Sequence, residues 1–139
     1  MSIRSGSAAT LVHTVTRQDI EDFARVSEDH HPNHVDDEYM GRTSYGRVIA
    51  HGILLMGFMS AASSRMLLDA ADDTPGTVVS YGYDRVRFVA PVFVGDEVTV
   101  DYEVVELDAD TGKGRSNVTV KNQVGDTVAV ATHLIKVVS

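Results

Sequence analysis

The sequence contains no cysteine among its 139 residues, which excludes a disulfide framework, a thiol nucleophile and a thiolate metal site. Basic residues are also scarce: 12 Lys and Arg stand against 20 Asp and Glu, and the net charge of −8 argues against a nucleic-acid-binding protein. The longest apolar stretch, residues 48–68, is interrupted by His51 and Arg65, so we expect no membrane span. The first residues carry one arginine and no apolar run, which predicts no signal peptide and a cytoplasmic location.

The residues that are present are typical of one folded domain. Apolar residues make up 43% of the sequence and charged residues 23%, the balance of an ordinary globular protein. A chain of this length can bury roughly 68–70% of its unfolded surface, which is enough for an independent core. We therefore expect a single domain over residues 1–139, with the small and polar segment 1–8 flexible.

The first half of the chain is predicted to form a short strand and two helices. A strand is expected at residues 11–15. Thr16 then resembles a helix N-cap, because Asp19 follows at the position that completes a capping box. Apolar residues at roughly helical spacing extend this first helix over residues 17–27. The apolar segment 51–70 predicts a second helix, long and mostly buried.

A turn at residues 72–76 leads into a second half that is rich in Val, Tyr and Thr. Strands are predicted at residues 77–89, 97–107, 115–124 and 127–138. The last three follow one another through short turns, which favours an antiparallel meander. A sheet of about five strands curled around the long helix gives an α+β domain. Two copies that pair edge to edge would cover its open edges, so we expect a homodimer or a higher homo-oligomer.

The candidate functional residues gather before and at the start of the long helix. Asp29 and His34 flank Pro32, which disfavours a preceding helical turn, so a turn or loop is expected from Asp29 to His34. His51 and Gly52 then open the long helix, whose first turn leaves free backbone N–H groups that stabilise negative charge. An acid/base pair beside such a helix terminus indicates an active site.

This pattern resembles the MaoC-like dehydratases, the (R)-specific enoyl-CoA hydratases of the hot-dog fold. The family signature Ser-Gly-Asp-x-Asn-Pro-(aliphatic)-His-x-Asp aligns with the stretch SEDHHPNHVD. The later segment VRFVAPVFVGDEVTV is similar to the family's strand-turn-strand, and the resemblance covers about residues 11–138. It implies a hot-dog fold, an acyl-CoA thioester substrate, and neither a metal nor a separate cofactor.

The resemblance also implies roles for individual residues. Asp29 and His34 fall on the family's catalytic pair, which would activate one water for addition across an enoyl thioester. Gly52 falls on the backbone N–H that would hold the thioester oxygen. His51 precedes it in the family's His-Gly pair, and Ser60 falls on a serine that supports the site by hydrogen bonding, so we assign both to substrate binding.

The chain departs from the family pattern at four positions. Glu28 replaces a glycine, so a position suited to positive φ bears a side chain. His31 replaces an asparagine that braces the loop, and Asn33 replaces an aliphatic residue. Met40 stands where the family prefers alanine, and we assign it to the acyl-binding pocket. A larger side chain there predicts a preference for short or polar acyl groups.

Other interpretations of the sequence stay open. A thioesterase on the same fold would also use a carboxylate and a helix terminus, and a non-catalytic acyl-CoA-binding or dimerisation partner would tolerate a changed loop. His30, His31 and His34 invite a metal-site interpretation, although the proline among them denies the first and last a common helical face. Arg85 and Arg87 alternate with apolar residues, which indicates either a solvated strand face or a phosphate clamp.

Two of the assigned residues also allow a purely structural interpretation. Ser60 fits as a small residue on a buried helix, and His51 fits as a helix-entry residue whose ring bonds a nearby carbonyl. His13 and His133 show no informative spacing, so the sequence gives them no role.

Overall fold

The computed structural model describes residues 3–70 and 76–139, so most of the turn predicted at residues 72–76 lies outside the described residues. The elements, in chain order, are β1 (Ala8–Thr14), α1 (Arg17–Ser27), α2 (Pro32–Val35), α3 (Asp37–Gly41), α4 (Gly52–Ala70), β2 (Thr77–Phe88), β3 (Glu97–Leu107), β4 (Lys113–Lys121) and β5 (Thr127–Val138). The bounds of α1, β3 and β5 are those that the sequence predicts, and α4 begins at the expected Gly52.

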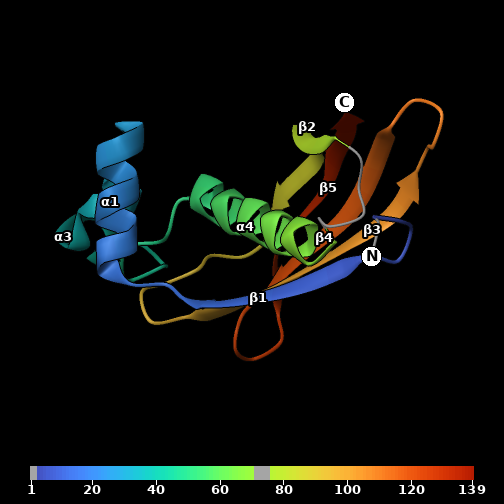
Figure 1. Ribbon diagram of the computed structural model, residues 1–139. Helices are drawn as coiled ribbons and strands as arrows, with labels where there is room; N and C mark the ends of the chain where they lie inside the picture. Colours follow the sequence, from blue (N-terminus) through green and yellow to red (C-terminus); the bar gives the residue numbers. More distant parts are fainter. Residues whose placement is uncertain (1–2, 71–75) are drawn as a thin grey trace.

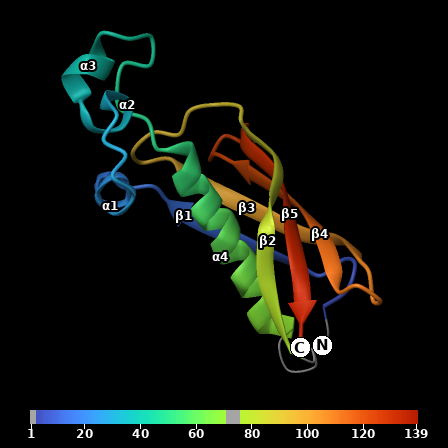
Figure 2. The ribbon, with the colours of Figure 1, turned by 90° about the horizontal axis from the view of Figure 1, so that it is seen from above.

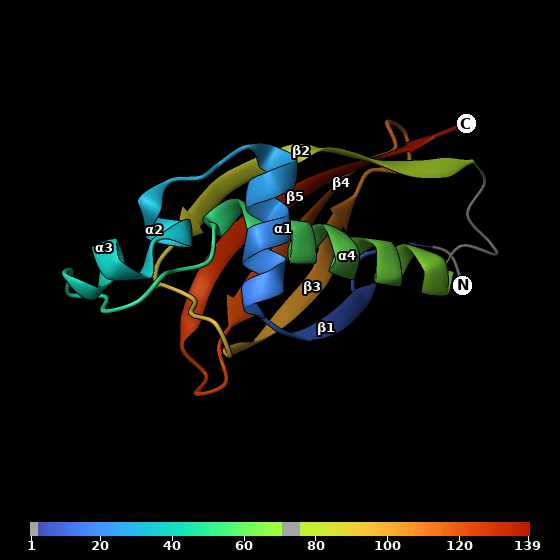
Figure 3. The ribbon, with the colours of Figure 1, turned by 90° about the vertical axis from the view of Figure 1, so that its left-hand side faces the viewer.

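The strands form one antiparallel sheet in the order β1-β3-β4-β5-β2. The neighbours β3, β4 and β5 make the meander that the sequence predicts, and β2 returns to the outer side of β5. The sheet curls around α4, which lies across its concave face (Figures 1 and 3). One long helix held in an antiparallel sheet is the hot-dog fold, so the predicted α+β class is confirmed.

The core lies between α4 and the sheet. Alternation along β3 buries one face of the strand, as predicted, and that face consists of Val98, Val100, Tyr102 and Val104. The helix buries residues at three- and four-residue spacing, namely Leu55, Met59, Ala62 and Met66. Truncating a fully buried side chain such as Met59 to alanine would cost about 2–5 kcal/mol. The sheet covers only one side of α4, so Ile53 and Leu68 are exposed and the helix is less buried than its apolar sequence predicts.

The helices α1, α2 and α3 lie together beyond one end of the sheet (Figures 1 and 2). The predicted capping box of α1 is confirmed: Asp19 N–H donates to Thr16 Oγ1 at 3.0 Å, and Thr16 N–H donates to Asp19 Oδ2 at 2.9 Å. The helix ends at Glu28, which has a left-handed φ of 66°. This left-handed residue turns the chain back toward the start of α4, and it is the position where the sequence predicts a need for positive φ.

The sequence predicts only a loop where α2 begins, and the prediction is wrong from Pro32 onward. Proline disrupts a helix interior, but at the first position of α2 its missing N–H costs no hydrogen bond. The His31 side chain caps this helix, because its Nδ1 accepts a hydrogen bond from Asn33 N–H at 3.1 Å. The short helix α3 is capped in the same way by Asp36, whose Oδ1 accepts from Tyr39 N–H at 2.9 Å.

Strand β2 is irregular near the site end of the sheet. Its register with β5 shifts between Asp84 and Arg87, and Arg85 has a φ of 54°. The simple alternation predicted for Arg85 and Arg87 is therefore broken by a bulge, although both side chains are exposed.

At the opposite end, the described part of the N-terminal segment contacts the sheet. Ile3 is buried, and Gly6 N–H donates to the Val104 carbonyl at 2.7 Å. The flexibility expected for residues 1–8 stays a prediction. Across the described ranges, no helix combines the length and the apolar content needed to cross a membrane.

Candidate active site

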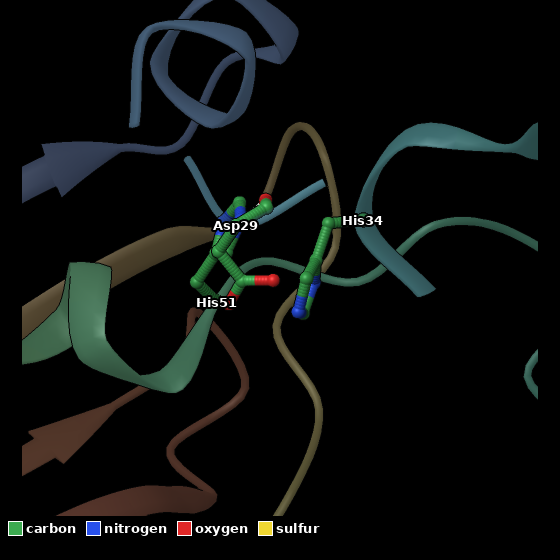
Figure 4. Close-up of side chains that lie close together, drawn as sticks. All are labelled: Asp29, His34 and His51. Carbon is green, nitrogen blue, oxygen red and sulfur yellow. Dashed lines mark hydrogen bonds between the residues drawn. The ribbon is translucent and has the colours of Figure 1, made fainter. Parts of the chain in front are cut away.

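Three side chains from separate segments meet beside the start of α4: Asp29 after α1, His34 on α2, and His51 just before α4 (Figure 4). One ligand-type atom from each residue lies within 4.8 Å of the others. The sequence predicts that Asp29 and His34 converge near Gly52, and the chain brings them there by turning at Glu28 and again after α3.

His34 is held in one tautomer by the main chain. Its Nδ1 lies 2.7 Å from the Ile49 carbonyl oxygen. A carbonyl can only accept, so Nδ1 carries the hydrogen and Nε2 keeps a free lone pair. Ile49 is fixed in turn, because its N–H donates to the Asn33 carbonyl on α2 at 2.9 Å. The half-buried His34 ring therefore presents a basic nitrogen, which is what a general base requires.

Asp29 is exposed and held by local hydrogen bonds. Its N–H donates to Ser27 Oγ at 3.2 Å, and its Oδ1 accepts a long hydrogen bond from His31 N–H at 3.3 Å. The other carboxylate oxygen accepts no hydrogen bond from any described residue, so it is free to bind a water or a substrate. The turn thus brings a carboxylate oxygen of Asp29 within 4.8 Å of a ring nitrogen of His34.

His51 is 2% exposed and lies behind His34. Its ring stacks on the His34 ring with centroids 3.8 Å apart and planes inclined by 26°, and Phe23 packs at 4.8 Å. Nε2 lies 3.0 Å from the Asp29 carbonyl oxygen, so Nε2 is the protonated nitrogen. Burial lowers the pKa of His51, the hydrogen bond to Asp29 opposes the shift, and the charge of nearby His34 adds to it. The ring is therefore neutral at pH 7.

Gly52 begins α4 and borders a cavity of about 280 Å³. His34, Tyr45 and Phe88 also line this cavity. A Cβ at position 52 would lie 2.5 Å from the Phe88 ring, so only glycine fits without displacing that ring. The N–H of Gly52 donates to no described residue, as expected for the first turn of a helix. It is therefore available to a negatively charged oxygen inside the cavity.

The other two predicted site residues lie apart from this group. Ser60 is exposed on α4, about 12 Å along the helix axis from Gly52 at 1.5 Å per residue. Met40 is 1% exposed on α3, with its sulfur 3.8 Å from Thr43 Oγ1, and it is not among the residues that line the cavity beside Gly52. The chain therefore gathers Asp29, His34, His51 and Gly52 but places Ser60 and Met40 elsewhere.

The residues with metal-binding geometry differ from those that the sequence suggests. His30 and His31 are exposed, and His31 caps α2. In the described residues, the group that could hold an ion is Asp29, His34 and His51. One nitrogen of each of these histidines already bonds a main-chain oxygen, which leaves three candidate ligand atoms. The same atoms suit the binding of a water between a carboxylate and an imidazole.

Sequence reasoning missed the aromatic residues around the site. Phe88 closes one side of the cavity at Gly52, Tyr45 lines it, and Phe23 supports the His51 ring. The one signal was weak: Phe88 directly precedes the segment 89–92, which lines the same cavity and contains a proline. Only the tertiary structure shows that these rings face the start of α4.

Known proteins resemble this chain over most of its length. A sequence profile of the MaoC like domain matches residues 6–128. An (R)-specific enoyl-CoA hydratase from Rhodospirillum rubrum is 37% identical over 105 residues, covering 76% of this chain and 68% of that protein. A 3-hydroxybutyryl-CoA dehydratase from Methylorubrum extorquens is 32% identical over 125 residues, covering 90% and 74% of the two chains.

Solved structures agree with the sequence relatives. The (R)-hydratase of Aeromonas caviae superimposes with a TM-score of 0.82 and 30% sequence identity, over 99% of both chains. The likeness therefore extends over the sheet, α4 and the segment that carries Asp29 and His34. The profile match and these relatives place the chain in the MaoC-like dehydratase family, as a lyase of the hydratase/dehydratase type.

Proposed function

We propose that the protein adds water to trans-2-enoyl-CoA to form (R)-3-hydroxyacyl-CoA and catalyses the reverse dehydration. The observation that carries this proposal is the convergence of the Asp29 carboxylate and the His34 ring, whose Nε2 is left free, near the N-terminus of α4. Two acceptors can hold both hydrogens of one water, and the helix terminus can hold the charge that forms on a thioester oxygen. The names of the hydratase and dehydratase relatives support the same substrate class.

In this mechanism the water lies between His34 Nε2 and the free Asp29 oxygen. One of the two groups takes a proton as the water oxygen bonds to C3, and the electrons of the C2=C3 bond move onto the thioester oxygen. The Gly52 N–H and the positive end of α4 stabilise that enolate. When the enolate collapses, the proton taken from the water is delivered to C2 on the same face. The base is thereby restored, and the product contains all the atoms of one water and one enoyl thioester.

His51 acts in this proposal as a positioning residue that does not touch the substrate. Its Nε2–H fixes the carbonyl of Asp29, and its face supports the His34 ring. Because burial keeps it neutral, it adds no positive charge that would lower the basicity of His34. Both catalytic residues are therefore aligned by one buried ring.

Two of the four departures from the family pattern are compatible with an intact loop around Asp29. Glu28 adopts the left-handed conformation that the turn requires, despite its side chain. His31 supplies through Nδ1 the hydrogen bond that a bracing asparagine would give. These two observations favour a catalytic protein over a non-catalytic acyl-CoA-binding homologue.

One assay separates hydration from thioester hydrolysis. Crotonyl-CoA is added to the protein, and loss of enoyl absorbance and release of free thiol are followed in parallel. Hydration lowers the absorbance without thiol release, whereas a thioesterase releases thiol. Coupling to (R)-specific and (S)-specific 3-hydroxyacyl-CoA dehydrogenases then identifies the product. Thiol release at the rate of absorbance loss, or an (S) product, would overturn the proposal.

A homodimer is the assembly that the surface supports. Strand β2 is an edge of the sheet, and Val79 and Tyr81 are exposed on it. The neighbouring helix α4 exposes Ile53 and Leu68, the latter by 77%. If two copies pair through β2, each copy covers the edge strand and the exposed apolar face of α4 of the other. Light scattering at micromolar concentration should give twice the chain mass; a monomer would contradict this assembly.

A further inference from the structure

A buried carboxylate lies in the connection between β2 and β3, at the site end of the sheet. Asp96 is 8% exposed, and both of its side-chain oxygens accept hydrogen bonds. Oδ2 accepts from the Phe93 N–H at 2.9 Å, and Oδ1 accepts from the Gln123 Nε2–H at 2.9 Å. Burial of a carboxylate costs free energy unless such bonds compensate for the lost water. In the mechanism above, this carboxylate has no role.

The bond from Phe93 connects Asp96 to His34. Phe93 forms an isolated antiparallel bridge with Ile49, and the Arg47 guanidinium lies over the Phe93 ring at 4.1 Å. The Ile49 carbonyl oxygen is the atom that fixes the His34 ring, with Nδ1 at 2.7 Å. The Asp96 side chain therefore holds the backbone segment that lies against the acceptor of His34.

The same connection forms one wall of the cavity beside Gly52. It passes the site residues (Figure 4), and its residues 89–92 line the cavity. Val92 is 2% exposed, and its carbonyl accepts from the Ala50 N–H at 2.8 Å. A shift of this connection would move the cavity wall together with the backbone that enters α4.

The main chain of Asp96 holds the start of α1. The Asp96 carbonyl accepts from the Val15 N–H at 2.9 Å, and the Gly95 N–H donates to the Val15 carbonyl at 2.8 Å. Val15 is fully buried and directly precedes Thr16, the N-cap of α1. Because α1 ends two residues before Asp29, its start and its direction fix where that carboxylate lies. Asp96 is thus the point at which the two chain segments that carry the catalytic pair are joined.

We propose that Asp96 is a positioning residue that fixes His34 relative to Asp29. This inference rests on the proposed hydration of enoyl thioesters. Asp96 is not among the residues that line the cavity, so it acts through Phe93 and Ile49. Loss of its side chain leaves the main-chain bonds at α1 in place but releases the Phe93 N–H, so His34 moves and Asp29 does not. A displacement of about 1 Å in a catalytic group can lower a rate on the order of 100-fold.

Gln123 allows the hydrogen bonds of Asp96 to be exchanged without a change in net charge. Its Nε2 donates to Asp96, and its Oε1 accepts from the Glu97 N–H at 3.1 Å. In Asp96→Asn, the new amide still accepts from the Phe93 N–H, but its NH2 group faces the NH2 group of Gln123, so one bond is lost. In the double variant Asp96→Asn/Gln123→Glu, donor and acceptor are swapped and all three bonds can form.

Steady-state kinetics with crotonyl-CoA tests the proposal. Asp96→Ala should lower kcat by roughly 10–100-fold and Asp96→Asn by about tenfold, with KM changed much less. The double variant should recover kcat to within about threefold of the wild type. The control for lost stability is Met66→Ala, which removes a buried side chain near the far end of α4 and should keep wild-type kcat. Wild-type kcat in folded Asp96→Ala, or no recovery in the double variant, would overturn the inference.

A measurement on the His34 ring separates this inference from the proposed function. In isotope-labelled protein, NMR follows exchange of the His34 Nδ1–H with water, and His34→Ala identifies its signal. The bond to the Ile49 carbonyl protects this hydrogen in the wild type. Its exchange should be at least about tenfold faster in Asp96→Asn and return to the wild-type rate in the double variant. That pattern supports the inference even if no enoyl-CoA is hydrated, whereas equal exchange in all three proteins refutes it even if crotonyl-CoA is hydrated.

Discussion

Two histidines are buried to the same extent in this protein but serve different ends. His51 and His133 are each 2% exposed, and burial lowers the pKa of both. His133 has side-chain partners on both nitrogens, whereas His51 bonds one main-chain oxygen and its Nδ1 has no hydrogen-bond partner among the described residues. His133, with both nitrogens bonded, stabilises the fold. His51, with one nitrogen unbonded, lies in the candidate active site, where polar atoms stay available to a substrate or a water.

The largest expected effect comes from the catalytic pair beside His51. Asp29→Asn and His34→Ala should each lower kcat by about 10²–10⁴-fold, because a positioned acid/base group contributes that much. The double variant should lose little more than either single one, since both residues act on one water. Steady-state kinetics with crotonyl-CoA gives these values. The exposed neighbour His30 provides the control, and His30→Ala should retain wild-type kcat. More than a tenth of wild-type kcat in either variant would contradict the assignment of Asp29 and His34 as the catalytic pair.

The next effect concerns His133 and acidic pH. Its pKa is lowered to about 4, whereas an unfolded histidine titrates near 6.5, so the unfolded state binds more protons between these values. Stability should be complete above about pH 6.5 and fall toward pH 4, by about 3 kcal/mol in total. Urea unfolding at a series of pH values measures this loss. His133→Gln should flatten the slope in that window, and an equally steep slope in the variant would contradict the assignment.

A smaller effect is expected at His51. His51→Phe keeps a ring against His34 but loses the bond to the Asp29 carbonyl, and His51→Gln keeps a donor but loses the ring. Each should lower kcat by roughly 10–100-fold, because small displacements of catalytic groups are costly. KM should change much less, and the pH profile of kcat/KM should keep its shape because a neutral side chain replaces a neutral ring. Wild-type kcat in both variants, or a loss in KM alone, would show that His51 has no positioning role.

The smallest effect is expected at the strained turn before Asp29. Glu28 has a φ of 66°, a conformation that costs an L-residue about 1–2 kcal/mol. Glu28→Gly relieves this strain but loses more backbone entropy on folding, so a net stabilisation of roughly 0.5–1 kcal/mol is expected. Thermal unfolding measures it, with kcat as the control for an unmoved loop. A lower Tm in the variant would show that the Glu28 side chain stabilises the turn.

Local signals in the sequence predicted most of the fold. The capping box at Thr16 placed α1, the apolar run after Gly52 placed α4, and alternation with turn residues placed the strands. The predicted strand at residues 115–124 ends earlier, at Lys121, because the Asn122 side chain accepts two backbone hydrogen bonds and forms a turn. The errors at α2 and at the β2 bulge have the same kind of cause. Each depends on a backbone conformation that residue type alone does not determine.

The candidate site was predictable to the extent that it follows the family signature. Asp29, His34 and Gly52 were placed together correctly from that resemblance. The buried contact between Tyr102 and His133 was not, because it joins residues that are far apart in the sequence. Alternation can show that Tyr102 and His133 point inward, but not that they meet. That information lies in the strand order, in which β4 alone separates β3 from β5.

The way in which the two site histidines are oriented affects which mutations the site tolerates. Each is oriented by a main-chain oxygen, that of Ile49 for His34 and that of Asp29 for His51. A main-chain oxygen survives any side-chain substitution at its own position. The His34 tautomer that exposes Nε2 therefore does not depend on the side chain at position 49. Substitutions there can change the cavity wall and leave the protonation of His34 as it is.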